Sequence, residues 1–138
     1  MTDATIGEAA CACGQVRLKL RGGPEYVSSC ACQACQRRTG AALAVNAIYQ
    51  EAQVIERVGE VRPFRRIAES GAAVDYNFCP QCGSTVWWRA ASRPGMVMVA
   101  AGAFADAAYP PPQRLIWAEH KADWVQAPAG VPVFPRAS

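Results

Sequence analysis

Apolar and polar residues alternate in short runs along most of the chain, which is the pattern of half-buried β-strands. The clearest run, at residues 16–20, reads Val-Arg-Leu-Lys-Leu and places every second side chain on one face. Other short runs that predict strands lie at residues 42–48, 54–58, 64–67, 74–78, 85–88, 96–100 and 115–117. Many short strands separated by Gly and Pro turns predict an all-β fold.

Helical periodicity is weak throughout. We expect at most a short helix near Cys35 or over residues 119–124. Residues 128–138 form a Pro-rich tail that we expect to pack loosely. Because the chain has no internal repeat and no linker, residues 1–138 are predicted to form one domain, with a motif-bearing core at about residues 8–127.

The composition excludes several classes of protein. Hydrophobic residues make up 51% of the 138 residues and charged residues 18%, so the chain does not resemble a disordered protein. No apolar run approaches the roughly 20 residues that a membrane helix needs. The first eight residues lack the basic flank and apolar stretch of a secretory signal. These features predict a cytoplasmic protein that does not span a membrane.

Cysteine is the most informative residue type in this sequence. The chain has seven cysteines and one histidine, His120. An odd number of cysteines in a reducing compartment argues against disulfides, whereas close spacing lets several thiolates chelate one ion. Zinc is the leading metal and an iron–sulfur cluster is the alternative. The cysteines fall into three tight groups: Cys11 and Cys13; Cys30, Cys32 and Cys35; Cys79 and Cys82.

Metal binding also changes the charge balance. The formal charge of +3 counts every thiol as neutral. Seven thiolates and two Zn²⁺ ions bring it to zero, which removes the net basic field that nucleic-acid binding requires. We therefore expect no nucleic-acid partner.

Two partitions of the cysteines give plausible metal sites. In one, the outer pairs form a four-ligand site and the central three form a second site. In the other, the two Cys-x-x-Cys pairs at residues 32–35 and 79–82 combine, and three cysteines are left over. The glycines favour the first partition, because Gly14 and Gly83 follow the outer pairs and permit the positive φ that turns backbone N–H groups toward sulfur.

Under the first partition the two sites differ in kind. Four cysteine ligands are typical of a structural zinc site, whereas three protein ligands leave a position open for a substrate. Cys30, Cys32 and Cys35 are therefore candidate catalytic zinc ligands, unless an Asp, Glu or His closes the site. Arg37 and Arg38 follow them, where they can offset thiolate charge or hold an anionic substrate.

A few other residues have two interpretations each. We expect His120 to be exposed or locally bonded rather than a proton shuttle, and the four tryptophans to be core residues more often than pocket walls. Met96 and Met98 are most simply core. On a strand, Arg65 and Arg66 point to opposite faces, so only one of them can face a carboxylate-bearing ligand.

Short motifs surround the cysteines and follow residue 100. They read Cys-Ala-Cys-Gly-Gln-Val-Arg at 11–17, Cys-Ala-Cys-Gln-Ala-Cys at 30–35 with Arg37, Arg38 and Gly40 behind it, Phe-Cys-Pro-Gln-Cys-Gly at 78–83, and Ala-Gly-Ala-Phe-Ala-Asp at 101–106. Together with Trp124, they make the chain from about residue 8 to residue 124 resemble the family of glutathione-dependent formaldehyde-activating enzymes, which includes centromere protein V.

The resemblance carries several implications. It implies a β-tent of folded antiparallel sheets around zinc and a carbon–sulfur lyase activity that joins glutathione and formaldehyde into S-hydroxymethylglutathione. It implies a catalytic zinc on the central three cysteines, and no general base can be named. A non-enzymatic, zinc-stabilised module that binds a protein partner is the alternative. The implied structural zinc ligands are Cys11, Cys13, Cys79 and Cys82.

Overall fold

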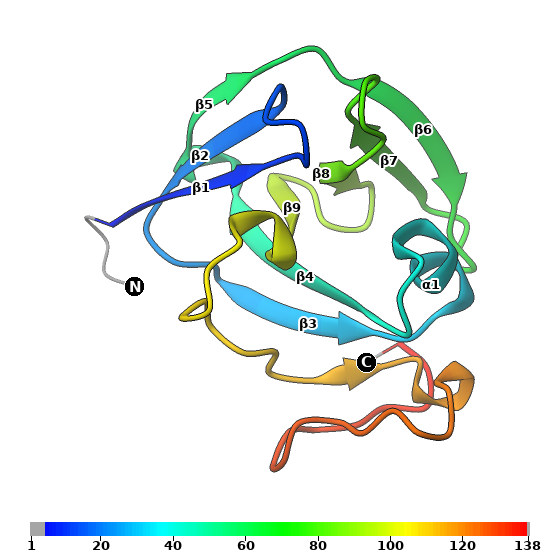
Figure 1. Ribbon diagram of the computed structural model, residues 1–138. Coiled ribbons are helices and arrows are strands. Elements are labelled where there is room, and N and C mark those ends of the chain that lie inside the picture. The colour runs from blue at the N-terminus through cyan, green and yellow to red at the C-terminus, as the bar shows by residue number, and fades with distance from the viewer. Residues whose placement is uncertain (1–4, 138) are drawn as a thin grey trace.

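Two β-sheets form the framework of the computed structural model, which describes residues 5–137 (Figure 1). The prediction of an all-β fold built from antiparallel sheets is confirmed. Residues 1–4 and Ser138, which the predicted domain includes, lie outside the described residues. Within residues 5–137, no helix has the length and apolar character needed to cross a membrane.

The smaller sheet has three antiparallel strands in the order β1-β2-β5. Its register places Ile6 opposite Arg21 and Arg17 opposite Val58. The strands are β1 (Ile6–Ala10), β2 (Arg17–Arg21) and β5 (Val54–Val58).

The larger sheet has seven strands in the order β10-β3-β4-β9-β8-β7-β6. All of its neighbours are antiparallel except β10 and β3, which run parallel. The strands are β3 (Tyr26–Cys30), β4 (Ala44–Gln50), β6 (Arg62–Ile67), β7 (Ala73–Phe78), β8 (Thr85–Ala90), β9 (Met96–Ala100) and β10 (Leu115–Ile116).

Among the residues that the structure describes, helix is limited to short pieces. The α-helix α1 (Gln33–Thr39) directly follows β3, as expected near Cys35. Only a 3-10 turn, η3 (Ala118–His120), overlaps the other predicted position. Two further 3-10 turns are η1 (Glu51–Gln53) and η2 (Ala101–Phe104).

The larger sheet packs apolar side chains on both of its faces. Adjacent residues alternate between two buried clusters, as the two-residue period of a strand requires. Trp87 belongs to the cluster that the smaller sheet covers, and Trp88 belongs to the cluster on the opposite face. Val97 and Met98 divide in the same way. The second face is therefore free of the smaller sheet and forms the wall of a pocket described below.

The tryptophans and methionines partly match the core prediction. Trp87, Trp88 and Met98 are buried, and Met96 packs against the second cluster. Trp124, however, is 76% exposed, because it lies in irregular chain after η3 and outside every buried cluster of the described residues. The core expectation is wrong for this tryptophan.

The Pro-rich tail is tied down more firmly than the sequence predicts. Leu115 N–H donates to the carbonyl of Pro132 at 3.0 Å, and Phe134 N–H donates to the carbonyl of Leu115 at 2.9 Å. Trp117 N–H donates to the carbonyl of Arg136 at 3.1 Å. The tail therefore covers the outer side of β10, and the expectation of loose packing is not met.

Candidate functional site

The seven cysteines gather into two separate groups. The first, called the four-cysteine group, contains Cys11, Cys13, Cys79 and Cys82, and their sulfur atoms lie within 4.8 Å of one another. The second, called the cysteine triplet, contains Cys30, Cys32 and Cys35 within the same limit. This grouping follows the first of the two partitions, and the pairing of residues 32–35 with 79–82 does not occur.

Two similar turns build the four-cysteine group. Cys11 N–H donates to the carbonyl of Val16, and Cys79 N–H donates to the carbonyl of Ser84, so each turn spans six residues. Gly14 and Gly83 have φ values of 80° and 78°, in the left-handed region that glycine adopts without strain. The positive φ expected after each outer pair is therefore present.

These turns direct backbone N–H groups at sulfur. Val16 N–H donates to Cys11 Sγ at 3.1 Å, and Cys82 N–H donates to Cys79 Sγ at 3.5 Å. Such bonds stabilise thiolates. The hydrogen bond with the Ser84 hydroxyl, followed by backbone hydrogen bonds from Ser84 and Cys13, lowers the pKa of Cys82 to about 5. The pKa of Cys11 is also lowered, whereas the pKa of Cys13 is raised to about 11. Cys82 is therefore the most acidic thiol among these shifted cysteines.

The cysteine triplet lies where β3 passes into α1. Cys30 ends β3 and is buried, Cys32 is the N-cap of α1, and Cys35 lies buried in the first turn of that helix. The Cys32 sulfur accepts a hydrogen bond from Cys35 N–H at 3.3 Å. This bond fixes the orientation of the Cys32 side chain, in the way that an N-cap oxygen does in other helices.

The electrostatic environment makes Cys32 the most acidic thiol of the triplet. Hydrogen bonds with Cys30 and then Cys35 lower the pKa of Cys32, and the charge of Arg66 adds to the effect. The hydrogen bond with Cys32 raises the pKa of Cys30. A thiolate at Cys32 is the donor that a soft metal ion needs.

Both groups fit a single zinc ion in their donor chemistry. Tetrahedral zinc with Zn–S bonds of about 2.3 Å separates its sulfur ligands by about 3.8 Å. Cys13 Sγ lies 3.6 Å from both Cys11 Sγ and Cys79 Sγ. An iron–sulfur cluster inserts several irons and sulfides between its cysteines, which suits the compact groups less well. The two groups can bind metal ions, and zinc is consistent with them.

A small pocket opens beside the triplet. This triplet pocket has a volume of about 200 Å³ and is lined by all three cysteines, by Tyr76 and Trp88 of the second core cluster, and by Trp117. Cys32 also lines a neighbouring surface groove. The triplet therefore borders open space on two sides.

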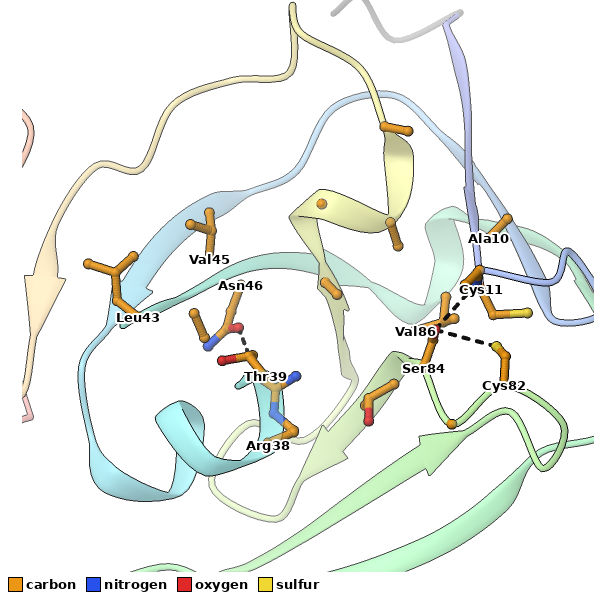
Figure 2. A pocket seen from close by; sticks show the side chains of 18 residues that line it. Ala10, Cys11, Arg38, Thr39, Leu43, Val45, Asn46, Cys82, Ser84 and Val86 are labelled. Carbon is orange, nitrogen blue, oxygen red and sulfur yellow. Dashed lines mark hydrogen bonds between the residues drawn. The ribbon is translucent and has the colours of Figure 1, made fainter. Parts of the chain in front are cut away.

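A larger cleft lies between the four-cysteine group and α1 (Figure 2). Its volume is about 860 Å³, and its walls consist largely of small residues. Figure 2 shows Cys11 and Cys82 on one side and Arg38 and Thr39 on the other. Arg38 donates a hydrogen bond to Asn46 Oδ1 at 3.3 Å, and both residues line the cleft as well as the triplet pocket. They mark the boundary between the two spaces.

The structure separates the arginines that the sequence singled out. Arg38 lies in the triplet pocket with its guanidinium 4.4 Å from the Trp88 ring centre, whereas Arg37 is exposed and outside the lining of that pocket. Arg65 faces outward and binds Asp75 at 2.7 Å, and Arg66 lines the triplet pocket. Strand alternation predicted that Arg65 and Arg66 would point to opposite faces of the sheet, but not which of them faces the pocket.

His120 lies outside the triplet pocket. Its ring stacks on Trp117, with 5.8 Å between the ring centres, and its Nε2 lies 3.5 Å from Glu119. This environment matches the expected exposed and locally bonded side chain.

Two further arginines of the triplet pocket have no signal in the sequence. Arg93 comes from the turn between β8 and β9, and Arg114 immediately precedes β10. Arg114 donates to Ser28 Oγ at 3.0 Å. Neither residue lies near a cysteine in the chain, so only the folded sheet brings them to the triplet.

The comparisons with known proteins agree with the sequence motifs. No protein among those with curated functions matched this sequence. A crystal structure of a Rhodobacter sphaeroides protein has a similar fold, with a TM-score of 0.56 and 18% sequence identity, and the similarity covers 91% of this chain and 98% of that one. The family described as glutathione-dependent formaldehyde-activating enzyme matches residues 7–120. This match spans most of the chain, and the protein therefore belongs to the glutathione-dependent formaldehyde-activating enzyme family.

Proposed function

We propose that this protein is a zinc-dependent enzyme of the carbon–sulfur lyase type that acts on a small thiol adduct. Glutathione and formaldehyde, which appear in the family's description, are the first substrates to consider. The product of their addition is S-hydroxymethylglutathione, and the enzyme would catalyse its formation or its breakdown.

The observation that carries this proposal is the incomplete ligand set of the triplet. Its three sulfurs converge within 4.8 Å, and among the described residues no His, Asp, Glu or further Cys joins them. Three protein ligands next to an open pocket are typical of a catalytic zinc site, whereas structural sites are closed. A zinc ion held there would bind the substrate sulfur as its fourth ligand and keep that sulfur deprotonated at neutral pH.

The reaction itself is a balanced addition. A thiolate sulfur attacks the carbonyl carbon of formaldehyde, a carbon–sulfur bond forms, and the carbonyl π electrons move to oxygen. That oxygen takes up the proton that the thiol has released. The described residues lining the triplet pocket include no His, Asp or Glu, so we assign proton exchange to water. A pre-formed thiolate needs little help from a general base.

The chain's own residues would position the substrate. The second core cluster and Trp117 provide an apolar wall, and Arg38 lies between the triplet pocket and the cleft. The cleft, with about 860 Å³ and mostly small side chains, has room for the body of a tripeptide such as glutathione. Its contact with the triplet pocket at Arg38 and Asn46 supports a thiol substrate that extends from one space into the other.

We assign the four-cysteine group a structural zinc. It joins turns that lie 66 positions apart in the chain, at Cys13 and Cys79. A metal ion at this point cross-links the end of β1 to the hairpin between β7 and β8, and its binding energy adds to folding.

The alternative function is a non-enzymatic module that binds a protein partner. A fourth protein ligand at the triplet would favour it, because a closed site has no catalytic position. The open pocket beside the three sulfurs favours the enzyme instead.

Zinc analysis tests the proposal first. We expect two zinc ions per chain, one of which is lost under mild chelation without unfolding. Circular dichroism before and after chelation reports the fold. Two ions that leave only when the chain unfolds, or a triplet that never binds metal, would support the non-enzymatic, partner-binding alternative.

Activity is the second test. Exchange between free formaldehyde and S-hydroxymethylglutathione can be followed by NMR at equilibrium, so the spontaneous reaction provides the baseline. We expect the two-zinc protein to accelerate exchange and the mildly chelated protein to lose that acceleration. A folded two-zinc protein without any acceleration would exclude this substrate pair.

A further inference from the structure

Four arginines from four different parts of the chain line the triplet pocket. They come from α1, β6, the β8–β9 turn and the segment before β10, and no Asp or Glu occurs among the described residues of the lining. A pocket of about 200 Å³ therefore contains a concentrated positive charge. The four residues are Arg38, Arg66, Arg93 and Arg114.

Two of these arginines have unsatisfied buried nitrogens. The Nε atoms of Arg38 and Arg66 are buried and have no hydrogen-bond partner among the described residues. By contrast, Arg65, the neighbour of Arg66 on the same strand, donates two hydrogen bonds to Asp75 at 2.7 and 3.1 Å. A buried donor without an acceptor is unfavourable and rare in folded proteins. An anion bound against these two guanidinium groups would offset that cost through their charge and their other N–H donors.

The charge exceeds what the cysteines require. Three thiolates and one Zn²⁺ carry a formal charge of −1, whereas four guanidinium groups carry +4. One arginine would suffice to balance the triplet. Arg114 already interacts with its neighbours, among them Ser28. Arg38, Arg66 and Arg93 still exceed the charge that the triplet needs, and guanidinium groups bind carboxylates through paired, charge-assisted hydrogen bonds.

We propose that the triplet pocket binds a carboxylate next to the substrate sulfur, so that the preferred substrate is the adduct of a compact mercaptocarboxylic acid. Its sulfur faces Cys30, Cys32 and Cys35, and its carboxylate faces Arg66 with Arg38 and Arg93. This inference rests on the proposed function for the role of the sulfur, but the arginines are independent of it.

The size of the pocket gives the inference its specificity. The cysteines and the arginines line one space of about 200 Å³, so the two functional groups of the ligand must be only a few bonds apart. In 3-mercaptopropionate two methylene groups separate the sulfur from the carboxylate. In glutathione both carboxylates lie at the far ends of the two peptide arms, so they reach these arginines less directly.

Calorimetric titration of the zinc-loaded protein at low ionic strength tests the inference. The ligand pair is 3-mercaptopropionate and its uncharged isostere, 3-mercaptopropionamide, which carry the same thiol and the same chain length. We expect the acid to bind at least tenfold more tightly, a difference equivalent to about 1.4 kcal/mol. We also expect it to bind more tightly than glutathione. Equal affinities for the acid and the amide would overturn the proposal.

Variants then locate the carboxylate. Arg66→Gln should reduce the preference for the acid to less than threefold and leave the affinity for the amide unchanged. Arg93→Gln, which alters an exposed side chain, should reduce the preference without affecting the fold. The matched control is Arg65→Gln, the adjacent outward-facing arginine, which should leave both affinities unchanged. If Arg65→Gln lowers the preference as much as the pocket variants do, the arginine assignment is wrong.

The same titrations separate this inference from the proposed function. If neither thiol binds, the role assigned to the substrate sulfur fails, and titration with propionate alone decides the inference. Propionate binding that Arg66→Gln weakens supports an anion site, and its absence overturns it. If the acid binds as expected but no thiol adduct turns over, the inference stands and the proposed enzyme does not.

Discussion

Removing one cysteine sulfur should affect mainly stability in the four-cysteine group and mainly activity in the cysteine triplet. Cys82→Ala removes a ligand of the metal that we expect to cross-link distant turns, so the domain should unfold or lose most of its stability. Cys32→Ala should leave a folded chain that binds one zinc and has no activity, with about 1 kcal/mol lost through the missing N-cap of α1. Zinc content and thermal unfolding measure both effects. An unfolded Cys32→Ala protein would show that the triplet is structural.

At Gly59 the surrounding backbone leaves no room for a Cβ atom. Gly59 has a φ of 92°, and a Cβ atom there would lie 2.1 Å from the carbonyl oxygen of Gln15, in the turn that carries the first two cysteines. Gly59→Ala should therefore destabilise the fold by roughly 3 kcal/mol or more. Urea unfolding measures this loss.

Gly71 provides the matched control for that substitution. Its φ of 89° is nearly the same, but nothing lies within 4 Å of the Cβ position. Gly71→Ala should cost only the left-handed backbone strain, about 1 kcal/mol. Equal losses of unfolding free energy in the two variants would mean that the contact with Gln15 does not contribute to the destabilisation.

Some residues of the candidate site could be predicted from the sequence and others could not. The glycines that follow the outer cysteine pairs indicated the correct grouping, because backbone conformation is a local property. The convergence of Arg66, Arg93 and Arg114 on the triplet was not predictable, because it depends on the order of strands in the larger sheet. Adjacent arginines such as Arg65 and Arg66 can be assigned to opposite faces, but their pattern does not say which face is the pocket.

At the scale of elements, the tail and β10 depend on each other. Trp117, which lines the triplet pocket, has a φ of 58°, and its N–H is held by the carbonyl of Arg136. A non-glycine residue in this conformation is strained and needs support from its surroundings. The tail supplies that support through backbone hydrogen bonds worth roughly 1 kcal/mol each.

Ending the chain at Pro128 should release this support. We expect faster hydrogen exchange at the amides of Leu115 and Trp117, weaker zinc binding at the triplet, and little change in the core between the two sheets. Hydrogen exchange read by NMR tests each amide, and buried Val97 serves as the internal control. Unchanged exchange at Leu115 would show that the tail does not stabilise β10.

The strands β1 and β3 were not predicted from the sequence, and their residues explain why. β1 reads Ile-Gly-Glu-Ala-Ala, and Gly and Ala have low strand propensity. β3 contains Ser28 and Ser29, which are buried although they are polar. Their hydroxyls are satisfied by Arg114, which lies 85 or 86 positions away. Burial that depends on so distant a partner leaves no periodic signal, whereas the alternating runs that became β2 and β7 were identified correctly.

At the scale of the whole molecule, Glu51 joins the two sheets. It binds Arg57 of β5 at 2.6 Å and Arg89 of β8, and both guanidinium groups lie about 5 Å from the ring of Trp87. Burial tends to raise the pKa of Glu51, but hydrogen bonds from Arg89 and Arg57 outweigh it and the pKa is lowered.

This lowered pKa sets the direction of a pH effect. The stabilisation is fully present above the usual pKa of 4.5 and is lost as the pH falls through the lower pKa of the folded state, because the unfolded chain takes up its proton first. Glu51→Gln should cost roughly 1 kcal/mol at pH 7. Urea unfolding of both proteins from pH 7 to pH 3 should show this difference shrinking below pH 4.5. A constant difference would exclude the two ion pairs as its cause.

The spacing of the cysteines along the chain imposes an order on protein synthesis. The triplet lies within residues 30–35, so its thiols leave the ribosome together. The four-cysteine group joins Cys13 to Cys79, which are 66 positions apart, and it is complete only after Cys82 has been translated. At roughly 5–20 residues per second, the nascent chain carries a finished three-thiol chelator for several seconds before the second group exists. A brief shortage of zinc during translation would therefore affect the two groups at different moments.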